Sequence, residues 1–175
     1  MKDEKQYCST CRWYRVFEGV CVNGDSEYAA EFRALDDTCE KWKSMVIGFF
    51  MAMQPPTCTH QEKQVHVVNG KPVFYEPPEL KAAREKFRAH LGRHVPDERF
   101  TGPIRLTTWW CFPVEGKHRN GEYRTSKPDT DNLVKLLKDV MTELHFWNDD
   151  AQVASEVIEK YWADIPGIYV KVESL

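Results

Sequence analysis

The 175-residue chain has no apolar run long enough to cross a bilayer, so we expect no membrane-spanning segment. Its N-terminal stretch, residues 1–8, is too polar for a secretory signal peptide, and we therefore expect a cytoplasmic protein. Structural disulfides are rare in that compartment, so the cysteines need another explanation. The chain also has no internal repeat and no low-complexity stretch.

The sequence also lacks an excess of positive charge. Its formal net charge is −3, which provides no overall attraction to nucleic acid, so any basic surface must be local. Hydrophobic residues make up 42% and charged residues 29%, which permits a real core and argues against disorder. The length suits one ordinary domain with an appendage.

The most informative stretch runs from Lys127 to Lys135 and reads Lys-Pro-Asp-Thr-Asp-Asn-Leu-Val-Lys. Proline is disfavoured in helix interiors and restricts its predecessor, so Pro128 marks a loop that ends where a helix begins. Asp131 and Lys135 lie one turn apart on the same side of that helix, and Asn148-Asp149-Asp150 follows its end. The helix is predicted from apolar positions that recur with helical period: Leu133, Leu136, Leu137, Val140, Met141 and Leu144.

One helix and its two ends would thus gather three carboxylates, those of Asp129, Asp131 and Asp150, beside the ammonium group of Lys135. Clustered carboxylates repel one another, and a divalent cation is the natural way to hold them together. Ligand sets made only of oxygen favour magnesium or manganese, which are usually shared with substrate phosphates. Such a metal activates water and neutralises charge on a phosphodiester, while Lys135 would face the phosphate or the leaving oxygen.

The same residues also permit an ordinary structural explanation. Asp129 or Thr130 would cap the helix, because the macrodipole favours carboxylates near a helix N-terminus. Asp131 and Lys135 would then form a helix-surface ion pair. Asp-Thr-Asp alone is a cap more often than a metal site, whereas the added Lys135 and Asp149-Asp150 favour a functional role.

This string is followed, after an amphipathic helix, by Trp147-Asn148-Asp149-Asp150-Ala151-Gln152-Val153, and together they resemble the RusA-type Holliday-junction resolvases. The motifs of that family are a basic residue, D-x-D-N-L-x-K, and then D-D-x-Q-V after the helix. The resemblance implies a metal-dependent endonuclease, often phage-encoded, that acts as a homodimer on four-way DNA junctions. By the same resemblance Asp129, Asp131 and Asp150 match the essential carboxylates, Lys135 the catalytic lysine and Asp149 the neighbouring aspartate.

A weaker resemblance extends from about Val46 to the C-terminus. The family has a glycine- and lysine-rich loop after its first strand, whereas this chain has residues 57–63, with His60 and Lys63 as the main polar anchors. That departure leaves the DNA contacts of this loop open. We expect His60 to be a surface or hydrogen-bonded histidine and not a metal ligand.

Residues 1–44 differ from the rest of the chain, because they contain four of the six cysteines and few aliphatic residues to make a core. Four thiolates around zinc would stabilise such a small module. The spacing is not the usual pair of Cys-x2-Cys motifs, so a loop segment with free or disulfide-bonded thiols is an equal alternative. The family resemblance does not cover this segment. The candidate zinc ligands are Cys8, Cys11, Cys21 and Cys39.

From residue 45 to 175 the patterns predict an α+β domain, a mixed and mostly antiparallel sheet with two main helices, preceded by the small cysteine-rich module. Residues 46–53 are nearly all apolar and predict a buried central strand. Trp109 lies on the second face of a strand at 104–114, which predicts either core packing or a further surface for a helix or dimer partner. The remaining predicted elements are a hairpin turning at Asn69-Gly70, a helix at 79–91, and strands at 152–162 and 168–172, the last antiparallel to its predecessor.

The polar loop 115–126 lies immediately before the acidic stretch and contains several basic residues. A flexible basic loop beside a metal cluster would clamp a DNA backbone, since phosphate contacts supply most of the affinity; the alternative is a solvated surface loop. Lys81, Arg84 and Arg88 share a helix face that would either meet phosphates or be solvated. The candidate DNA-binding residues are Lys63, Lys117, Arg119, Arg124 and Lys127.

The acidic stretch predicts hydrolysis of a phosphodiester by in-line attack of a metal-activated water, and the family resemblance implies that the substrate is branched DNA, in recombination and repair. Magnesium or manganese would be held by the three carboxylates, and two protomers would supply the paired nicks that a symmetric junction needs. Two alternatives remain. One is a nuclease for flaps or other branched DNA; the other is a non-catalytic, zinc-containing DNA-binding module whose aspartates are helix caps.

Overall fold

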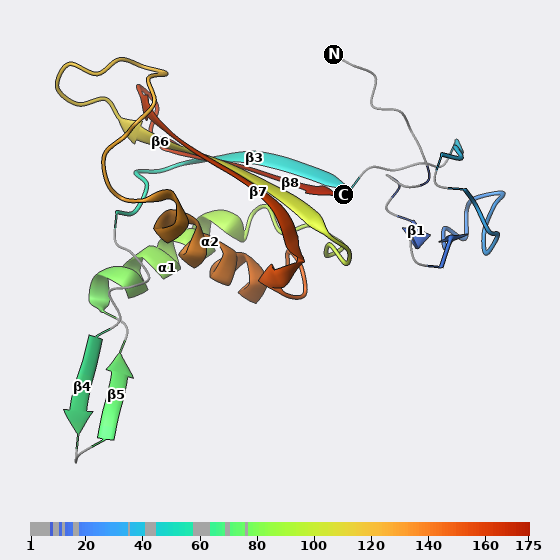
Figure 1. Cartoon of the computed structure of the whole chain (residues 1–175), viewed down its shortest axis with the longest axis horizontal. Helices are drawn as coiled ribbons and strands as arrows, with labels where there is room; N and C mark the ends of the chain where they lie inside the picture. The colour runs from blue at the N-terminus through green and yellow to red at the C-terminus, as the bar shows by residue number, and fades with distance from the viewer. Residues whose placement is uncertain are drawn as a thin grey trace. The chain divides into compact units, whose positions relative to one another are not determined.

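The computed structural model describes residues 8, 11, 13–15, 18–34, 36–40, 45–57, 64–68, 71–75 and 77–175, with the backbone alone for 64–68 and 71–75. Its contacts group residues 1–47 and 173–175 into one unit and residues 48–172 into another. The larger unit has the predicted α+β architecture, a sheet with two helices on one of its faces (Figure 1). Among the described parts of the chain, no helix has the length and apolarity that a bilayer crossing requires.

Four strands form the sheet, in the order β3 (Val46–Ala52), β8 (Gly167–Ser174), β6 (Ile104–Pro113) and β7 (Val153–Ala163). β6 and β7 run parallel, whereas a short turn at residues 164–166 reverses the chain between β7 and β8, so the sheet is mixed as predicted. β8 therefore runs antiparallel to β7, as predicted, but it lies between β3 and β6 and does not pair with β7. Its alternate residues Ile168, Val170 and Val172 are fully buried, which suits a central strand.

β3 lies at the edge of the sheet, which corrects the expectation of a buried central strand for this apolar run. Alternate residues of β3 are exposed, among them Val46 and Phe50. On the opposite side of the strand, Phe49 stacks on His94 with 4.1 Å between the ring centroids. A continuous apolar run indicates that a strand can be buried, but it does not indicate the place of the strand in the sheet.

The two faces of the sheet differ because side chains alternate along each strand. One face packs against α1 (Pro78–Leu91) and α2 (Thr130–Glu143) and forms the core. Within it the Trp110 indole N–H donates to the Thr108 hydroxyl at 3.0 Å, so these buried polar groups satisfy each other. The buried side chains of this core include Leu80, Phe87, Leu91, Ile104, Leu106, Trp110, Phe112, Leu133, Leu137, Val140 and Met141.

The other face of the sheet, called the open face below, is covered by neither α1 nor α2 (Figure 1). Trp109 is 42% exposed there, and its ring centroid lies 4.7 Å from that of Tyr169 and 6.5 Å from that of Tyr161. Tyr123, from the loop after β6, stacks on Tyr161 at 4.8 Å. Trp109 is therefore a surface residue and not part of the core.

β4 (Gln64–Val68) and β5 (Lys71–Tyr75) form the predicted hairpin, in which Val68 pairs with Lys71. The Asn69-Gly70 turn itself lies outside the described residues. The Asn-Gly pair between two short runs rich in valine and aromatic residues explains why the sequence predicted this element.

The N-terminal unit contains a second, shorter antiparallel pair, β1 (Tyr14–Arg15) and β2 (Val20–Cys21). The Tyr14 hydroxyl donates to the Arg33 carbonyl oxygen at 2.7 Å and so joins this pair to the segment that follows it. Phe32 forms an isolated bridge with Val20. Short local contacts of this kind build the described part of the unit.

Gly167, the first residue of β8, has no room for a side chain. A Cβ atom there would stand 2.6 Å from the Met51 carbonyl oxygen and would overlap the Phe50 ring. The backbone oxygen cannot rotate aside, so Gly167→Ala should lower the free energy of unfolding by about 1–3 kcal/mol, as measured by chemical denaturation. Gly102→Ala is the matched control, because nothing lies within 4 Å of a Cβ at that position. Equal stability of the two variants would contradict this packing.

Candidate active site

Asp129 and Asp131 lie at the start of α2, and both side chains are exposed. Asp129 occupies the N-cap position, yet its carboxylate makes no capping hydrogen bond; only its backbone carbonyl accepts one, from the Leu133 N–H at 3.2 Å. Within the described chain, no residue donates a hydrogen bond to either carboxylate or forms an ion pair with it. The helix-cap alternative therefore does not account for the Asp129 side chain.

Lys135 lies one turn beyond Asp131 on α2 and is also exposed. Among the residues that the structure describes it has no ion-pair partner, so the ordinary surface pair with Asp131 is not formed. Residues at this spacing share one side of a helix. Two carboxylates and one ammonium group are thus presented together to solvent at the N-terminal end of α2.

Asp149 and Asp150, which sequence reasoning treated as a pair, have different surroundings. Asp149 caps the short helix η3 (Asp150–Gln152): its Oδ1 accepts from the Ala151 N–H at 2.8 Å, and the Gln152 Oε1 accepts from the Asp149 N–H at 3.2 Å. Gln152 also donates to the Gly102 carbonyl oxygen at 2.9 Å. Asp149 and Gln152 therefore hold this loop in place, whereas the half-buried Asp150 side chain is engaged by no other described residue.

The structure does not bring the three predicted metal ligands together in one chain. Asp129 and Asp131 lie at one end of α2 and Asp150 follows the other end, and a helix of 14 residues spans about 20 Å. Among the described residues, no three His, Cys, Asp or Glu side chains lie close enough to hold a metal ion. The expectation that one helix and its two ends gather the carboxylates is wrong for a single chain, because the rigid helix separates them.

Contacts between β7 and α2 independently indicate the same separation of Asp150 from Asp129 and Asp131. Lys160 of β7 reaches the loop before α2, with its Nζ 2.8 Å from the Pro128 carbonyl oxygen. Further back along β7, Glu156 pairs with Lys138 in the middle of α2 at 3.1 Å. The strand and the helix are thus antiparallel, and from Lys160 back to Val153 the strand covers about 23 Å. Asp150 lies beyond Val153, at the far end.

The loop 115–126, predicted to be flexible, folds back along the free edge of β7. The Trp162 N–H donates to the Glu122 carbonyl oxygen at 2.8 Å, and Tyr123 forms a bridge with Tyr161. His118 stacks on Trp162 with 4.5 Å between ring centroids. Its Nδ1 lies 2.9 Å from the Glu122 carboxylate, and this hydrogen bond lowers the pKa of Glu122. The loop is therefore an ordered extension of the sheet.

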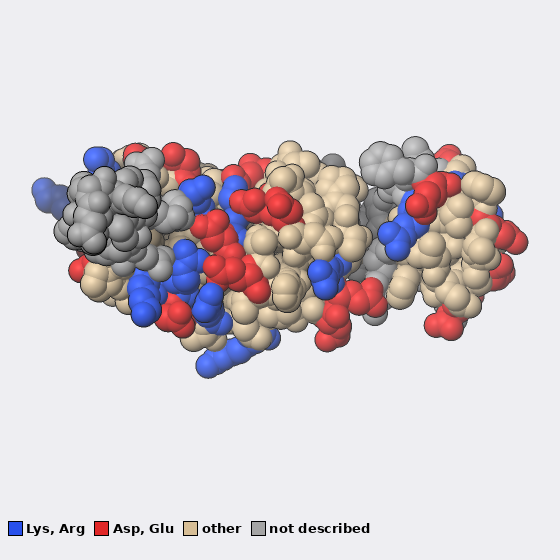
Figure 2. Space-filling model, turned by 90° about the horizontal axis from the view of Figure 1, so that it is seen from below, with Lys and Arg blue, Asp and Glu red and all other residues tan. Residues whose placement is uncertain are grey.

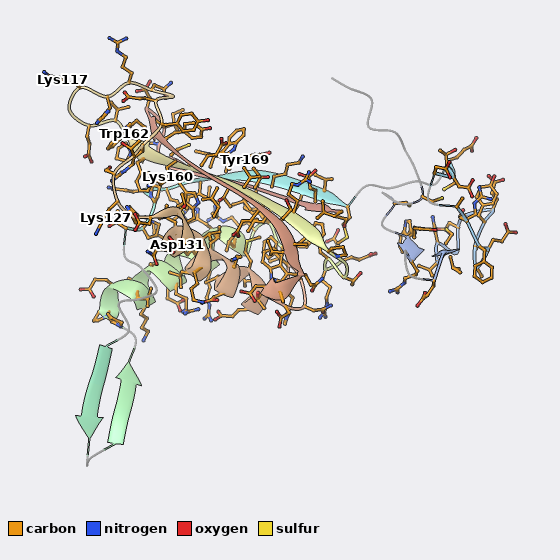
Figure 3. The ribbon with its side chains drawn as sticks, in the orientation of Figure 1. Lys117, Lys127, Asp131, Lys160, Trp162 and Tyr169 are labelled. Atoms are coloured by element: carbon orange, nitrogen blue, oxygen red, sulfur yellow. The ribbon has the colours of Figure 1, made fainter. Side chains whose placement is uncertain are left out.

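The predicted DNA-binding residues fall into two groups. Lys117, Arg119 and Lys127 are exposed, and Figure 3 shows Lys127 near Asp131 with Lys117 further out on the loop. Arg124 is engaged within the chain: its guanidinium carbon lies 4.0 Å from the Phe112 ring centroid, and its Nη2 donates to the Lys127 carbonyl oxygen at 2.8 Å. Lys63 lies outside the described residues.

Two arginines of the basic face predicted on α1 connect this helix to α2. Arg84 Nη1 donates to Glu143 Oε1 at 2.8 Å, and Arg88 Nε donates to Glu143 Oε2 at 3.2 Å. Both arginines therefore pair with the C-terminal end of α2 rather than standing as a solvated face. Figure 2, seen from the helical side, shows acidic and basic side chains interspersed over this unit, in agreement with a basic surface that is only local.

Lys160 is the residue near the site that sequence reasoning missed. Its Nζ donates to two carbonyl oxygens, those of Ser126 at 2.9 Å and Pro128 at 2.8 Å, directly before Asp129. Lys160 pairs with the buried Trp110 in the sheet register, so its side chain leaves the sheet on the helical face. A lysine on the apolar side of an alternating strand was the available signal, because such a charge needs partners.

The predicted zinc ligands are four free thiols in the described part of the N-terminal unit. Cys8 and Cys21 are buried, and burial raises the pKa of the Cys8 thiol. The Cys11 N–H donates to the Cys8 carbonyl oxygen at 3.0 Å, which makes a turn of the Cys-x2-Cys segment. Thiols suit zinc chemically, but the described residues do not bring three of them into one metal-binding group.

Comparison with known proteins shows which families and relatives this chain is similar to. The family model described as Endodeoxyribonuclease RusA matches residues 54–173. The Crossover junction endodeoxyribonuclease rusA of Lactococcus phage r1t is 34% identical over 111 residues, which cover 62% of this chain and 83% of the relative. The Uncharacterized protein YqaN of Bacillus subtilis (strain 168) is 25% identical over 118 residues, which cover 61% of this chain and 82% of the relative.

The matched segment contains α2 with Asp129, Asp131 and Lys135, η3 with Asp150, and the sheet strands β6, β7 and β8 except the last residue of β8; it does not contain β3. It leaves out most of the N-terminal unit, as the sequence resemblance also did. Fold, motif and family model agree over this length. The chain belongs to the RusA endodeoxyribonuclease family.

Proposed function

We propose that this protein is a metal-dependent endonuclease that cleaves four-way DNA junctions in recombination and repair. Family membership and the crossover-junction activity for which the phage relative is named support the substrate class. The observation that carries the proposal is the set of uncommitted charges on the first turns of α2, the carboxylates of Asp129 and Asp131 with the ammonium group of Lys135. If these carboxylates served only as helix caps, the Asp129 side chain would accept a capping hydrogen bond, and it accepts none.

Magnesium or manganese is the proposed cofactor, because the available donors are carboxylate oxygens. Asp129 and Asp131 would hold the ion, and Asp150 would complete the set. When bound, such an ion activates water and neutralises charge on the phosphodiester. Lys135 would donate to the scissile phosphate or to the leaving oxygen, where negative charge develops in the transition state.

A homodimer would complete the site. Since α2 holds Asp150 about 20 Å from Asp131 within one chain, the third carboxylate would come from a second copy. A two-fold axis that passes beside α2 near its middle would place the N-terminal end of α2 in one protomer next to the C-terminal end of α2 in the other. Each of the two resulting sites would contain Asp129 and Asp131 from one protomer and Asp150 from its partner. This dimer is organised around α2 and leaves the open face around Trp109 uncovered.

DNA would be held mainly through its backbone. Lys117, Arg119 and Lys127 are exposed on the loop that leads to α2, where they would contact phosphates, and Lys63 is a further candidate for such a contact. Arg124 would add to these contacts, and its stacking on Phe112 of β6 and Trp162 of β7 keeps the loop on the sheet. Such contacts provide affinity without base specificity, so the shape of the junction would decide the substrate.

The N-terminal unit is proposed to hold zinc through Cys8, Cys11, Cys21 and Cys39. The support is the chemistry of four free thiols in a unit with a small core. Elemental analysis of the purified chain tests it directly. A structural zinc would leave the chemistry at α2 unaffected, because the proposed catalytic groups belong to the other unit.

The function is tested with a synthetic four-way junction, a flap and a linear duplex, each with and without magnesium. We expect symmetric paired nicks in the junction only when magnesium is present. Asp131→Asn should abolish cleavage and leave junction affinity near normal, because binding depends on basic groups. Asp164→Asn, in the exposed turn between β7 and β8, is the matched control and should cleave normally. Preference for the flap would assign the alternative nuclease, and cleavage by Asp131→Asn would remove this residue from the site.

Substitutions of Lys135 distinguish a catalytic role from a role in surface electrostatics alone. If it stabilises the transition state, Lys135→Ala should lower the single-turnover rate by about a hundredfold or more at unchanged junction affinity. Lys135→Arg keeps the charge but spreads it over a larger planar group, so a tight site should reject it. If Lys135 is only a helix-surface residue, its replacement should lower the free energy of unfolding by about 0.3–0.5 kcal/mol and change activity little. Near-normal rates in both variants would exclude a catalytic role.

A further inference from the structure

We infer that Lys160 is a positioning residue that fixes the loop before α2 and thereby aims Asp129 at the metal. The inference rests on the proposed function. Its basis is a pair of hydrogen bonds from one ammonium group to two carbonyl oxygens, those of Ser126 and Pro128. The second of these belongs to the peptide unit that leads directly into Asp129.

Arg124 acts on the same backbone from the same side. Its Nη2 donates to the carbonyl oxygen of Lys127, and its Nε donates to the Ser126 hydroxyl at 3.0 Å. Three successive carbonyl oxygens, of residues 126, 127 and 128, are thus each bound by a cation that comes from the sheet side. Charge-assisted hydrogen bonds of this kind are stronger than neutral ones and favour one conformation of the loop.

Asp129 needs such external support because it has none of its own. Its carboxylate makes no capping bond, so the direction of the side chain depends on the backbone that precedes it. Groups behind metal ligands commonly set the orientation of those ligands, and their loss typically costs 10–100-fold in metal affinity or activity. Lys160 has the geometry for this task, since it spans from the rigid strand β7 to the start of α2 (Figure 3).

Lys160 and Arg124 also lack an acidic partner among the residues that the structure describes. Lys138 of α2, in contrast, pairs with Glu156 of β7. The Lys160 ammonium group is thus engaged by backbone carbonyl oxygens of the loop and not by a carboxylate.

The test compares Lys160→Met with Lys138→Met, which removes an equal charge from the same strand–helix contact. In metal-free protein, amide hydrogen exchange of residues 126–135 should rise in Lys160→Met only. The half-saturating concentration of Mn²⁺ should increase about 10–100-fold, with single-turnover cleavage falling accordingly. Junction affinity in EDTA should stay within about twofold of wild type, because phosphate contacts lie elsewhere. Lys160→Arg, which keeps the donors, should recover most of the Mn²⁺ affinity.

Unchanged exchange of residues 126–135 in Lys160→Met would overturn the inference, and so would faster exchange with unchanged Mn²⁺ affinity. Loss of junction affinity in EDTA would show that Lys160 contacts phosphate instead. If Lys160→Met does not fold, Lys160→Gln replaces it, because its shorter amide cannot reach both carbonyl oxygens. The exchange readout needs no activity, so a wild-type protein that cleaves no junction would refute the proposed function and leave this test intact.

Discussion

The rigid length of α2 is the constraint on which the candidate site depends. Its apolar side is buried against the sheet along the whole helix, from Leu133 to Met141, so the helix cannot turn or slide relative to β7. The contacts of Lys160 at one end and Lys138 in the middle fix the same alignment. The packing of α2 in the core therefore keeps the carboxylates at its two ends apart.

This separation gives each group at the N-terminal end of α2 a distinct task. Asp129 and Asp131 are exposed and uncommitted, Lys135 shares their side of the helix, and Lys160 holds the loop from which they start. At the other end, Asp149 is used in a capping box while Asp150 stays available. In the proposed dimer, a metal site with three carboxylates would draw on two chains, and the two-fold symmetry would supply two such sites at once.

Local patterns predicted most of the elements. The helical period from Leu133 to Met141, the Asn69-Gly70 pair and the alternation along residues 104–114 each depend on neighbours in sequence, and the structure has a helix, a hairpin and a strand there. What failed was non-local. The place of β8 between β3 and β6, and the distance from Asp131 to Asp150, depend on packing between segments far apart in the chain. The partners of Lys160 could not be predicted for the same reason.

The most direct test of the two-chain site is complementation between two inactive variants. Asp131→Asn and Asp150→Asn are purified separately, mixed to exchange subunits, and given a four-way junction with magnesium. A mixed dimer has one intact site, so the mixture should regain nicking at about a quarter of the wild-type number of sites, mostly in one strand of each junction. Asp129→Asn mixed with Asp131→Asn should regain none, because both changes fall on the same half of the site. No recovery in the first mixture, with junction binding and subunit exchange intact, would contradict the account.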